Sequence, residues 1–354
     1  MTVIRETEVV TSSDSPPVSV RRPIKMKDLA ALAGVSASTI SRSLANHFSI
    51  PQATREAIQK LAAEHGYVVN NSARSLRQSQ TRTIALALPL GHEQEQLISD
   101  PFFLRLFGHL ADEITKRGFD VLLVREPAPE SGWLERLIGS SRADAYIVVG
   151  QSTQHEALNL VAQNFLPMIV GGSPLPGQKY CTVGSDNFAG GRIATEHLIA
   201  SGRTKIAFVG PAALPQIDLR LEGYKAALQQ SALILADELI LDAHFTGTSA
   251  FDAVGAALKS GLKIDAIFAA SDGIAVSAIR ALEEAGLRCP EDIAVVGFDD
   301  SDLASKSKPL LTTIRQDVQA MAARIVALLF ERLEGHDTQS EWLPVALVVR
   351  ESAP

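Results

Sequence analysis

The sequence predicts two folds in one chain, an all-α module at the N-terminus and a larger α/β body of parallel sheets covered by helices. Three observations support this. The length of 354 residues is more than twice the roughly 150 residues of one average domain. Helical periodicity of apolar residues fills the segment 24–66. From residue 83 onward, short apolar strands alternate with amphipathic helices.

The composition is that of an ordinary globular protein, with 46% hydrophobic and 21% charged residues. Residues 1–22 are rich in Ser, Thr, Pro and acids without apolar periodicity, so we expect a disordered leader. Cys181 and Cys289 fit neither a disulfide framework nor a zinc site. The chain also has no apolar signal core and no apolar stretch of about 18 residues. We therefore expect a cytoplasmic protein that contacts no membrane.

Residues 23–69 are predicted to be a headpiece of three helices, and the first two have the length and glycine-bearing turn of a helix-turn-helix. Gly34 ends the first helix, and Ser36 is the expected N-cap of the second, which continues to Asn46. Five hydrogen-bonding residues there suit a buried helix face poorly: Ser36, Ser38, Thr39, Ser41 and Arg42. We favour DNA binding over a plain bundle with solvated hydroxyl groups.

Charge supports that interpretation. Residues 21–82 contain ten Lys or Arg against three acids, a net charge of +7, whereas residues 1–20 carry −2 and residues 83–354 carry −12. A basic module on an acidic body predicts that the module meets a polyanion. Chance clustering of charge is the alternative.

The third helix is predicted to start at the capping-box spacing of Ser49 and Gln52 and to end at Gly66. The following segment 70–77 also has a helical pattern, but it is shorter than the roughly 12 to 15 residues that an isolated helix needs. We expect it to fold only against a partner, as a hinge helix within a linker over residues 70–82.

In the body, the predicted strands cover residues 84–88, 120–124, 145–149, 167–170, 205–209, 266–270 and 294–296. The predicted helices between them include residues 103–117, 191–201, 219–230, 249–260 and 273–285. About 270 residues are enough for two such sheets. Open α/β sheets bind ligands at the carboxyl ends of their strands, so a crevice between two sheets is a natural small-molecule site.

Ten motifs occur in order over residues 24–350: IKMKDLAALAGVSASTISRSL, TREAI, GY, ARSL, DPFF, SDN with GG, SGRTKIAFVG, RLEGY, VVGFDD and LTTIRQD. Together they give the chain a specific resemblance to the lactose and galactose repressor family (LacI/GalR) of bacterial transcription regulators. The resemblance implies a periplasmic-binding-protein-like core of two doubly wound parallel-sheet lobes. The implied lobes are residues 83–183 with 315–341, and 184–314 with 342–354, with chain crossings near Gly184, Ile314 and Trp342.

The resemblance also implies a homodimer, or a tetramer as a dimer of dimers, that binds a pseudo-palindromic operator in double-stranded DNA. Leu76 matches the leucine that the family wedges into the minor groove, and packing within the headpiece is the alternative. Val69 replaces the usual proline, and Ala45 replaces an asparagine that ends the recognition helix. Whether Asn46 takes over that contact stays open. The implied DNA-binding residues are Lys25, Ser36, Ala37, Ser38, Thr39, Ser41, Arg42, Thr54, Asn70, Ala73 and Leu76.

Ala37 and Ser38 lie where the family varies its side chains to select a DNA sequence. Both are short, so much of the discrimination is expected from Arg42, which can contact a guanine with two hydrogen bonds. The alternative role for Arg42 is a phosphate clamp.

Arg220 and Asp299 match residues that hold the effector in the family. An arginine fork and a carboxylate suit a polyol such as a mono- or disaccharide. A structural ion pair is the alternative for Asp299, as core packing is for Phe102 and Phe103. Ser271 stands where some members have asparagine, which leaves the sugar unidentified. The implied effector-binding residues are Phe102, Phe103, Arg220, Phe245, Ser271 and Asp299.

These observations predict a DNA-binding repressor of sugar uptake or catabolism genes that a small-molecule effector controls. A regulator corepressed by a purine or another metabolite is the first alternative. A sugar-binding transport protein is the second, although it needs an export signal and no basic headpiece. The sequence contains no Walker loop, Gly-x-Ser-x-Gly elbow or His-Glu-x-x-His motif, so we expect no enzyme, no catalytic residue, no metal and no cofactor.

Overall fold

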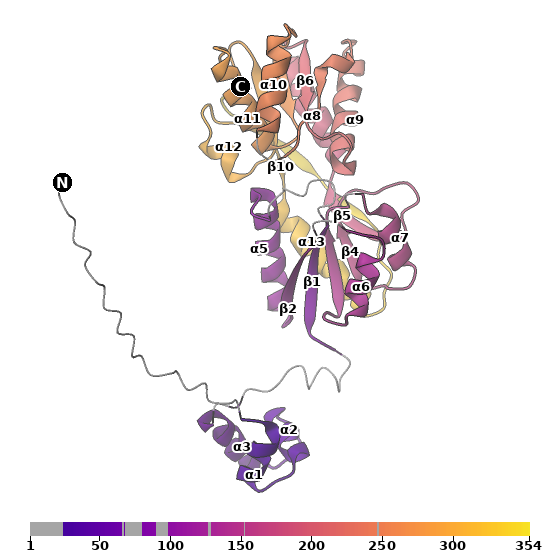
Figure 1. The fold of residues 1–354 in the computed structure, drawn as a ribbon, viewed down its shortest axis with the longest axis vertical. Helices are drawn as coiled ribbons and strands as arrows, with labels where there is room; N and C mark the ends of the chain where they lie inside the picture. Colours follow the sequence, from indigo (N-terminus) through magenta and orange to yellow (C-terminus); the bar gives the residue numbers. More distant parts are fainter. Residues whose placement is uncertain are drawn as a thin grey trace, which may run out of the picture. The chain divides into compact units, whose positions relative to one another are not determined.

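The computed structural model describes residues 24–65, 67, 80–89, 98–126, 129–151, 153–245 and 248–354. The chain divides into two compact units, Met1–Arg77 and Gln78–Pro354 (Figure 1). The expected leader 1–22 and the expected hinge helix 70–77 lie outside the described residues. No helix in the described ranges is both long and apolar enough to span a membrane.

The first unit contains three short helices, α1 (Met26–Ala33), α2 (Ala37–Leu44) and α3 (Gln52–Glu64). They share a small core that includes Leu29, Ile40 and Ile58. Gly34 adopts a positive φ of 64°, which lets the chain turn sharply from α1 into α2. The predicted N-cap is confirmed, because the Ser36 hydroxyl accepts a hydrogen bond from the Thr39 amide at 3.2 Å.

The capping box expected at Ser49 is wrong. Helix α3 starts after Pro51, and no side chain caps it. The Ser49 hydroxyl instead contacts Nδ1 of His47 at 2.9 Å, and Gln52 donates to Glu56 at 2.9 Å. A local turn between His47 and Ser49 has therefore taken the hydroxyl that the cap needed.

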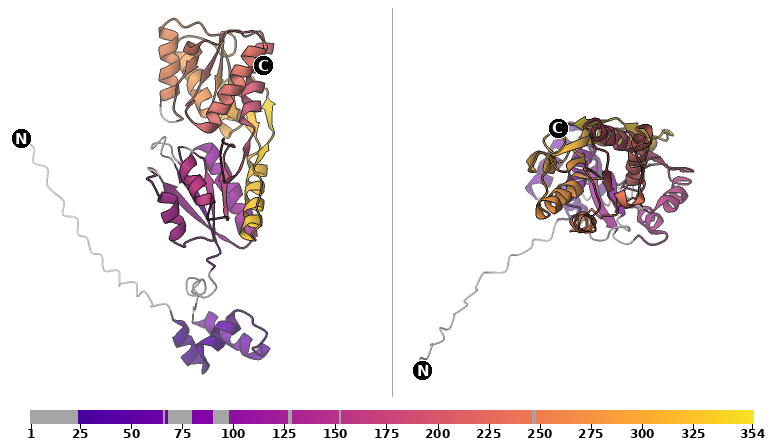
Figure 2. Two further views of the ribbon diagram at one scale, coloured as in Figure 1. Left: turned by 90° about the vertical axis from the view of Figure 1, so that its right-hand side faces the viewer. Right: turned by 90° about the horizontal axis from the view of Figure 1, so that it is seen from above.

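The second unit contains two six-stranded sheets, one in each lobe (Figures 1 and 2). The first-lobe sheet has the order β11-β5-β4-β3-β1-β2 and is parallel throughout. Its strands are β1 (Thr83–Pro89), β2 (Asp120–Glu126), β3 (Ala145–Val149), β4 (Met168–Gly171), β5 (Cys181–Ser185) and β11 (Glu341–Leu343). Its helices are α5 (Pro101–Lys116), α6 (Trp133–Gly139), α7 (His155–Ala162) and α13 (Val318–Leu333).

Two separate cores cover the faces of this first sheet. Ile84 and Leu86 of β1 join the core formed with α5 and α13, whereas Ala85 and Ala87 join the core with α6 and α7. Successive side chains of a strand point to opposite faces, so an apolar run such as β1 fits a sheet buried on both sides.

The second-lobe sheet has the order β12-β10-β9-β8-β6-β7, and one strand departs from the predicted parallel pattern. Strand β12 runs antiparallel to β10. The strands are β6 (Ile206–Val209), β7 (Ile240–Leu241), β8 (Ala266–Ala269), β9 (Ala294–Asp299), β10 (Thr312–Gln316) and β12 (Val345–Val348). The elements around them are α8 (Asn187–Ala200), α9 (Pro215–Gln230), α10 (Ser249–Lys259), α11 (Asp272–Glu284), α12 (Asp302–Lys306) and the 3-10 turn Asp237–Leu239.

The chain passes between the lobes three times, slightly later than the sequence boundaries implied. Strand β5 ends at Ser185, β10 continues in the second sheet to Gln316, and β11 continues in the first sheet to Leu343. The expected start of a first-lobe segment at residue 315 is therefore corrected by two residues, because Arg315 pairs with β9 and Gln316 pairs with β12. Asp186 and Asp317, which follow the first two strands, each cap the next helix with a 2.9 Å hydrogen bond.

Candidate functional site

A cleft lies between the two lobes at the carboxyl ends of their strands, and the empty space within it and its mouth is about 940 Å³. The ends of β1, β3, β4, β5, β9 and β10 reach it, as do the first turns of α5, α8 and α9. All six residues predicted to bind an effector line this cleft: Phe102, Phe103, Arg220, Phe245, Ser271 and Asp299. The fold thus brings together residues that are up to 197 positions apart in the sequence.

Arg220 is the buried cation of the cleft, with 6% of its surface exposed. Its Nε donates to Oδ1 of Asn187 at 2.8 Å, and its Nη1 donates to the Ala270 carbonyl. Burial lowers the pKa of Arg220 to about 10, although Asp299 and Asp272 oppose that shift. Within the described part of the chain Nη2 has no partner, so the guanidinium keeps one donor nitrogen for a ligand.

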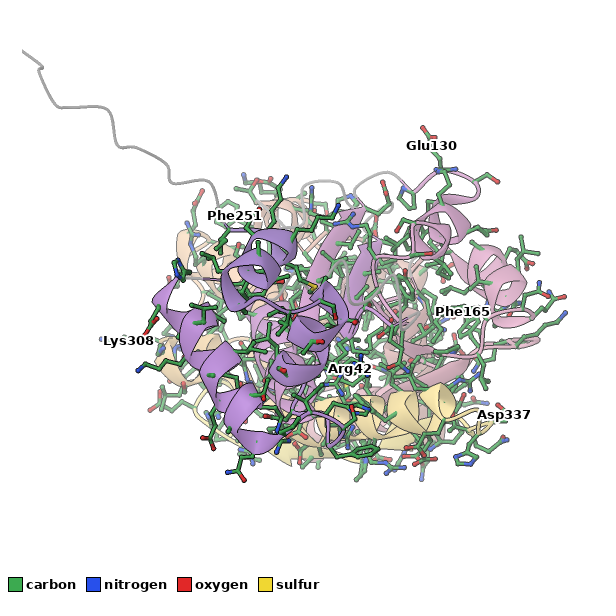
Figure 3. All side chains as sticks on the ribbon, turned by 90° about the horizontal axis from the view of Figure 1, so that it is seen from below. Arg42, Glu130, Phe165, Phe251, Lys308 and Asp337 are labelled. Carbon is green, nitrogen blue, oxygen red and sulfur yellow. The ribbon has the colours of Figure 1, made fainter. Side chains whose placement is uncertain are left out.

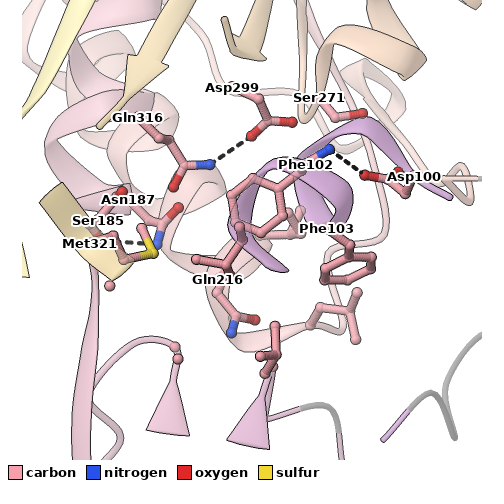
Figure 4. A pocket seen from close by; sticks show the side chains of 18 of the residues that line it. Asp100, Phe102, Phe103, Ser185, Asn187, Gln216, Ser271, Asp299, Gln316 and Met321 are labelled. Carbon is pink, nitrogen blue, oxygen red and sulfur yellow. Dashed lines mark hydrogen bonds between the residues drawn. The ribbon is translucent and has the colours of Figure 1, made fainter. Parts of the chain in front are cut away.

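Asp299, the last residue of β9, is the carboxylate of the cleft. Its Oδ1 accepts a hydrogen bond from Nε2 of Gln316 at 2.6 Å (Figure 4). Burial raises the pKa of Asp299 well above its ordinary value, while Arg220 acts in the opposite direction. Asp299 forms no ion pair with any described residue, which argues against the alternative of a structural ion pair.

Aromatic side chains form the apolar part of the cleft. Phe102 and Phe103 extend from the first turn of α5, with ring centres 5.7 Å apart in an edge-on arrangement (Figure 4). Both are half-buried. Each lines the cleft and also packs against the first-lobe core, so the effector-binding prediction and the core-packing alternative describe the same two side chains. Phe245 approaches the cleft from the second lobe, where it packs against the core of that lobe.

Ser271 caps α11 and also lines the cleft. Its hydroxyl oxygen accepts a hydrogen bond from the Ile274 amide at 3.2 Å. A serine hydroxyl can still donate its own hydrogen while it accepts. Ser271 therefore has a structural role that leaves one donor for the cleft.

Several polar residues of the cleft were not predicted as site residues. Asn187 holds Arg220, Gln316 holds Asp299, and Ser185 has a buried hydroxyl without a partner in the described residues. All three belong to quoted motifs or their immediate strands, and each lies at or just past the carboxyl end of a strand. A position at the carboxyl end of a strand was therefore the sequence signal that could have identified these three residues as cleft residues. The other polar residues lining the cleft that were missed are Asp100 and Gln216.

The predicted recognition helix α2 has one buried and one exposed face. Ile40 and Ser43 are buried, whereas Ala37, Ser38 and Arg42 are exposed. Nε of Arg42 (Figure 3) donates to the Ser38 carbonyl at 3.3 Å, and its terminal nitrogens have no partner among the described residues. These nitrogens can therefore donate to a guanine or to a phosphate.

The remaining predicted DNA-binding residues of the headpiece differ in how free their side chains are. The Ser36 hydroxyl contacts the hydroxyl groups of Ser38 and Thr39 at 2.8 and 2.9 Å, besides capping α2. Thr39, Ser41 and Thr54 are half-buried, and Lys25 is exposed just before α1. Asn70, Ala73 and Leu76 lie outside the described residues.

The structure also bears on the open question of Asn46. Its Oδ1 accepts a hydrogen bond from Nε2 of Gln59 at 2.8 Å, and its carbonyl accepts one from Nη1 of Arg55 at 3.0 Å. The side-chain oxygen is thus committed to α3. With one lone pair of that oxygen already used, Asn46 offers a base its amide nitrogen and one acceptor position, which weakens it as a substitute for the asparagine that Ala45 replaces.

No group of three or more His, Cys, Asp or Glu side chains in the described ranges is arranged to hold a metal ion.

Comparison with known proteins agrees with this architecture. Residues 25–70 match the family model of bacterial regulatory proteins of the lacI family, and residues 195–353 match a periplasmic binding protein-like domain. The regulator CelR of Thermobifida fusca is 33% identical over 338 residues, covering 94% of this chain and 98% of CelR. The ribose operon repressor of Escherichia coli K12 is 30% identical over 333 residues, covering 92% and 98%.

Solved structures of whole regulators are also similar. A CelR–cellobiose complex superposes with a TM-score of 0.70 at 32% identity, covering 94% of this chain and all of that one. A lac repressor dimer bound to its operator and an anti-inducer superposes with a TM-score of 0.82 at 25% identity, covering 94% and 99%.

A helix-turn-helix headpiece joined to a two-lobed periplasmic-binding-protein-like body defines a class of DNA-binding transcriptional regulators. The chain belongs to the LacI family of bacterial regulatory proteins. The relatives named above are regulators and not enzymes.

Proposed function

We propose that this regulator is a repressor that binds a pseudo-palindromic operator as a homodimer in the bacterial cytoplasm and that a neutral sugar in the cleft controls it. One observation carries the sugar assignment. A buried guanidinium and a carboxylate, Arg220 and Asp299, both keep polar atoms unpartnered among the described residues in a cleft lined by phenyl rings. Hydroxyl groups can accept from the first and donate to the second.

The same pair argues against charged effectors. An anion would face the carboxylate of Asp299, and a cation would face the guanidinium of Arg220. The phenyl rings of Phe102, Phe103 and Phe245 suit the apolar C–H face of a sugar ring. A relative solved with cellobiose and a relative named for the ribose operon support a mono- or disaccharide.

The test is a thermal-shift screen of the purified full chain with cellobiose, ribose, glucose, galactose and lactose, and with hypoxanthine and adenosine. A ligand present at 100 times its Kd stabilises the folded state by about 2.7 kcal/mol, which gives a clear rise in Tm. We expect a sugar to produce that rise. A response to a purine alone would replace the sugar proposal with the metabolite-responsive alternative.

Operator binding has its own test. Selection from random duplexes should return two half-sites related by approximate two-fold symmetry, and light scattering should give a dimer or a tetramer. The affinity should fall steeply with added salt, because Lys and Arg of the headpiece displace counterions. Leu76→Ala should weaken specific binding far more than nonspecific binding. Equal losses on both DNAs would contradict the wedge role of Leu76.

A further inference from the structure

Asp299 begins a strained turn. Asp299 and Asp300 have consecutive positive φ values of 112° and 49°, a conformation that residues other than glycine rarely adopt. Such strain persists only where surrounding contacts fix the backbone, and it is concentrated at functional sites. The contacts that hold the Asp299–Asp300 turn therefore determine where the Asp299 carboxylate points.

Most of these contacts come from the second lobe itself. The Asp300 carboxylate accepts from Nε of Arg315 at 2.7 Å and from Nη2 of Arg350 at 2.6 Å. Burial alone would raise the pKa of Asp300, but the hydrogen bonds from the two arginines outweigh it and lower that pKa. The next amide, of Ser301, donates to Oδ2 of Asp272 at 2.6 Å. The side chain of Asp300 is thus anchored on the second-lobe sheet.

One contact comes from the first lobe. Nη1 of Arg105 donates to the carbonyl oxygen of Asp300 at 2.9 Å. Arg105 lies on α5, about one helical turn after the cleft-lining Phe102. The charge of Arg105 also contributes, after Lys306, to the lowered pKa of Asp302 at the start of α12. Arg105 is therefore close to the chain that follows the turn, as well as bonded to the turn.

We propose that Arg105 is a positioning residue that makes the direction of the Asp299 carboxylate depend on the arrangement of the two lobes. When the lobes are in the arrangement described here, Arg105 holds the carbonyl of the strained turn. When they separate, this hydrogen bond is lost and only second-lobe contacts remain. A ligand that needs Asp299 in its present direction thus favours the lobe arrangement that keeps the bond, and the coupling is reciprocal. The expected effect on ligand affinity rests on the proposed function of the cleft, whereas the positioning role of Arg105 does not.

The first experiment needs no ligand. Hydrogen–deuterium exchange is measured on the ligand-free full chain for amides 299–302 in wild type, Arg105→Met, Arg105→Lys and Arg136→Ala. Methionine keeps the apolar stem of Arg105 without the donor, and lysine keeps a donor. Arg136 is the matched control, because its Nη1 also donates to a backbone carbonyl, that of Ser131, at 2.9 Å but within one lobe.

We expect exchange in amides 299–302 to rise about tenfold in Arg105→Met, with Arg105→Lys closer to wild type and Arg136→Ala unchanged. Exchange in β1, an interior strand of the first-lobe sheet, serves as the measure of intact folding in every variant. Unchanged exchange at the turn in a folded Arg105→Met would overturn the proposal. So would an equal rise throughout both lobes, since that reports general destabilisation.

The second experiment titrates cellobiose into the same four proteins. A roughly tenfold weaker Kd in Arg105→Met, with wild-type affinity in Arg136→Ala, is expected if the turn aims Asp299 at the ligand. Faster exchange at the turn together with unchanged cellobiose affinity would overturn the coupling to the ligand. If wild type binds no cellobiose, that result counts against cellobiose as the effector, and the exchange measurement alone decides the role of Arg105.

Discussion

The guanidinium carbon of Arg220 lies 3.5 Å from the ring centre of Phe298, so the cation of the cleft rests on the aromatic face of the residue that precedes Asp299. Phe298 is fully buried in β9. A Cβ at Gly190 would come within 2.7 Å of the same ring, so the ring is confined from another direction as well. Strand β9 thus serves both charged groups of the cleft. Its Phe298 ring lies against the Arg220 cation, and its last residue is Asp299 itself.

Phe298→Leu should lower the free energy of unfolding by about 2 to 4 kcal/mol, because it removes buried ring atoms and a desolvated cation–π contact. Phe268→Leu is the control, since Phe268 is equally buried in the neighbouring strand β8 with no cation against its ring among the described residues. Urea denaturation of both variants isolates the cation–π contribution. Equal losses would show that Arg220 gains nothing from the ring.

Asp299→Asn and Arg220→Ala should abolish the ligand response while leaving operator affinity without ligand close to that of wild type. Neither residue belongs to the headpiece, and each offers polar atoms to the cleft. Operator band shifts with and without the sugar found by thermal shift measure both quantities. A folded variant that still binds and responds normally contradicts the assignment. A folded variant that loses operator binding without ligand indicates a structural role in the lobe interface.

Gly191→Ala should destabilise the protein by about 1 to 3 kcal/mol or more and should also disturb the cleft. Helices α8 and α9 cross so closely there that an added Cβ would overlap the backbone carbonyl of Arg220. Gly255→Ala in α10 is the control, because its Cβ would meet no atom within 4 Å. This control should be stabilised by about 0.5 to 1 kcal/mol through helix propensity. Thermal unfolding that ranks the two variants in the opposite order would refute the close crossing.

The buried carboxyl group of Asp272 predicts a loss of stability as pH rises. Burial raises its pKa to about 6, from 3.8, although the hydroxyl of Thr313 and the amide of Ser301 donate to it. Between these two pH values the folded state holds the proton while the unfolded state has released it. Protonation of Asp272 therefore stabilises the folded state fully below about pH 4, and this stabilisation is lost as the pH rises through about 6. The corresponding change in the free energy of unfolding is roughly 3 kcal/mol.

Urea denaturation of wild type and Asp272→Asn at pH 4, 5, 6 and 7 measures this effect. Asparagine can accept from the Ser301 amide and donate to the Thr313 hydroxyl without titrating. We expect the stability of wild type relative to Asp272→Asn to fall across that range. A constant difference would mean that Asp272 keeps an ordinary pKa in the folded state.

Arg42→Ala should reduce discrimination at one base pair in each half-site by roughly 1 to 3 kcal/mol, the value of a two-bond contact to guanine. The terminal nitrogens of Arg42, which have no partner in the described part of the chain, lie on the exposed face of α2 and permit this contact. Competition between single-base variants of the operator provides the measurement. A uniform loss over all sequences would instead make Arg42 a phosphate clamp.

The fold class was predictable because apolar strands and glycine-terminated helices leave strong local patterns. Strands β5, β7, β10, β11 and β12 were missed. Strand β7 has only two residues, and the other four are short or mixed with polar residues near the lobe crossings. Arg220 and Asp299, which the structure places in the cleft, were predicted as effector-binding residues from their motifs. Gln316 and Asn187 were not, because each acts by holding another side chain, and the partner is known only once β10 and α8 are placed. Arg105 contacts a residue 195 positions away, a pairing that no local pattern indicates.

The three lobe crossings have a consequence for biosynthesis. The first lobe acquires its edge strand β11 only with residues 341–343, and the second acquires β12 only with residues 345–348. The backbone carbonyl of Ser352 then accepts a hydrogen bond from the Val295 amide at 2.9 Å. On the ribosome, therefore, neither lobe can be completed until residues 341–352 have emerged, while the headpiece is already free to fold. A stalled or truncated product should thus retain a folded DNA-binding headpiece on a body that chaperones and proteases still recognise as unfinished.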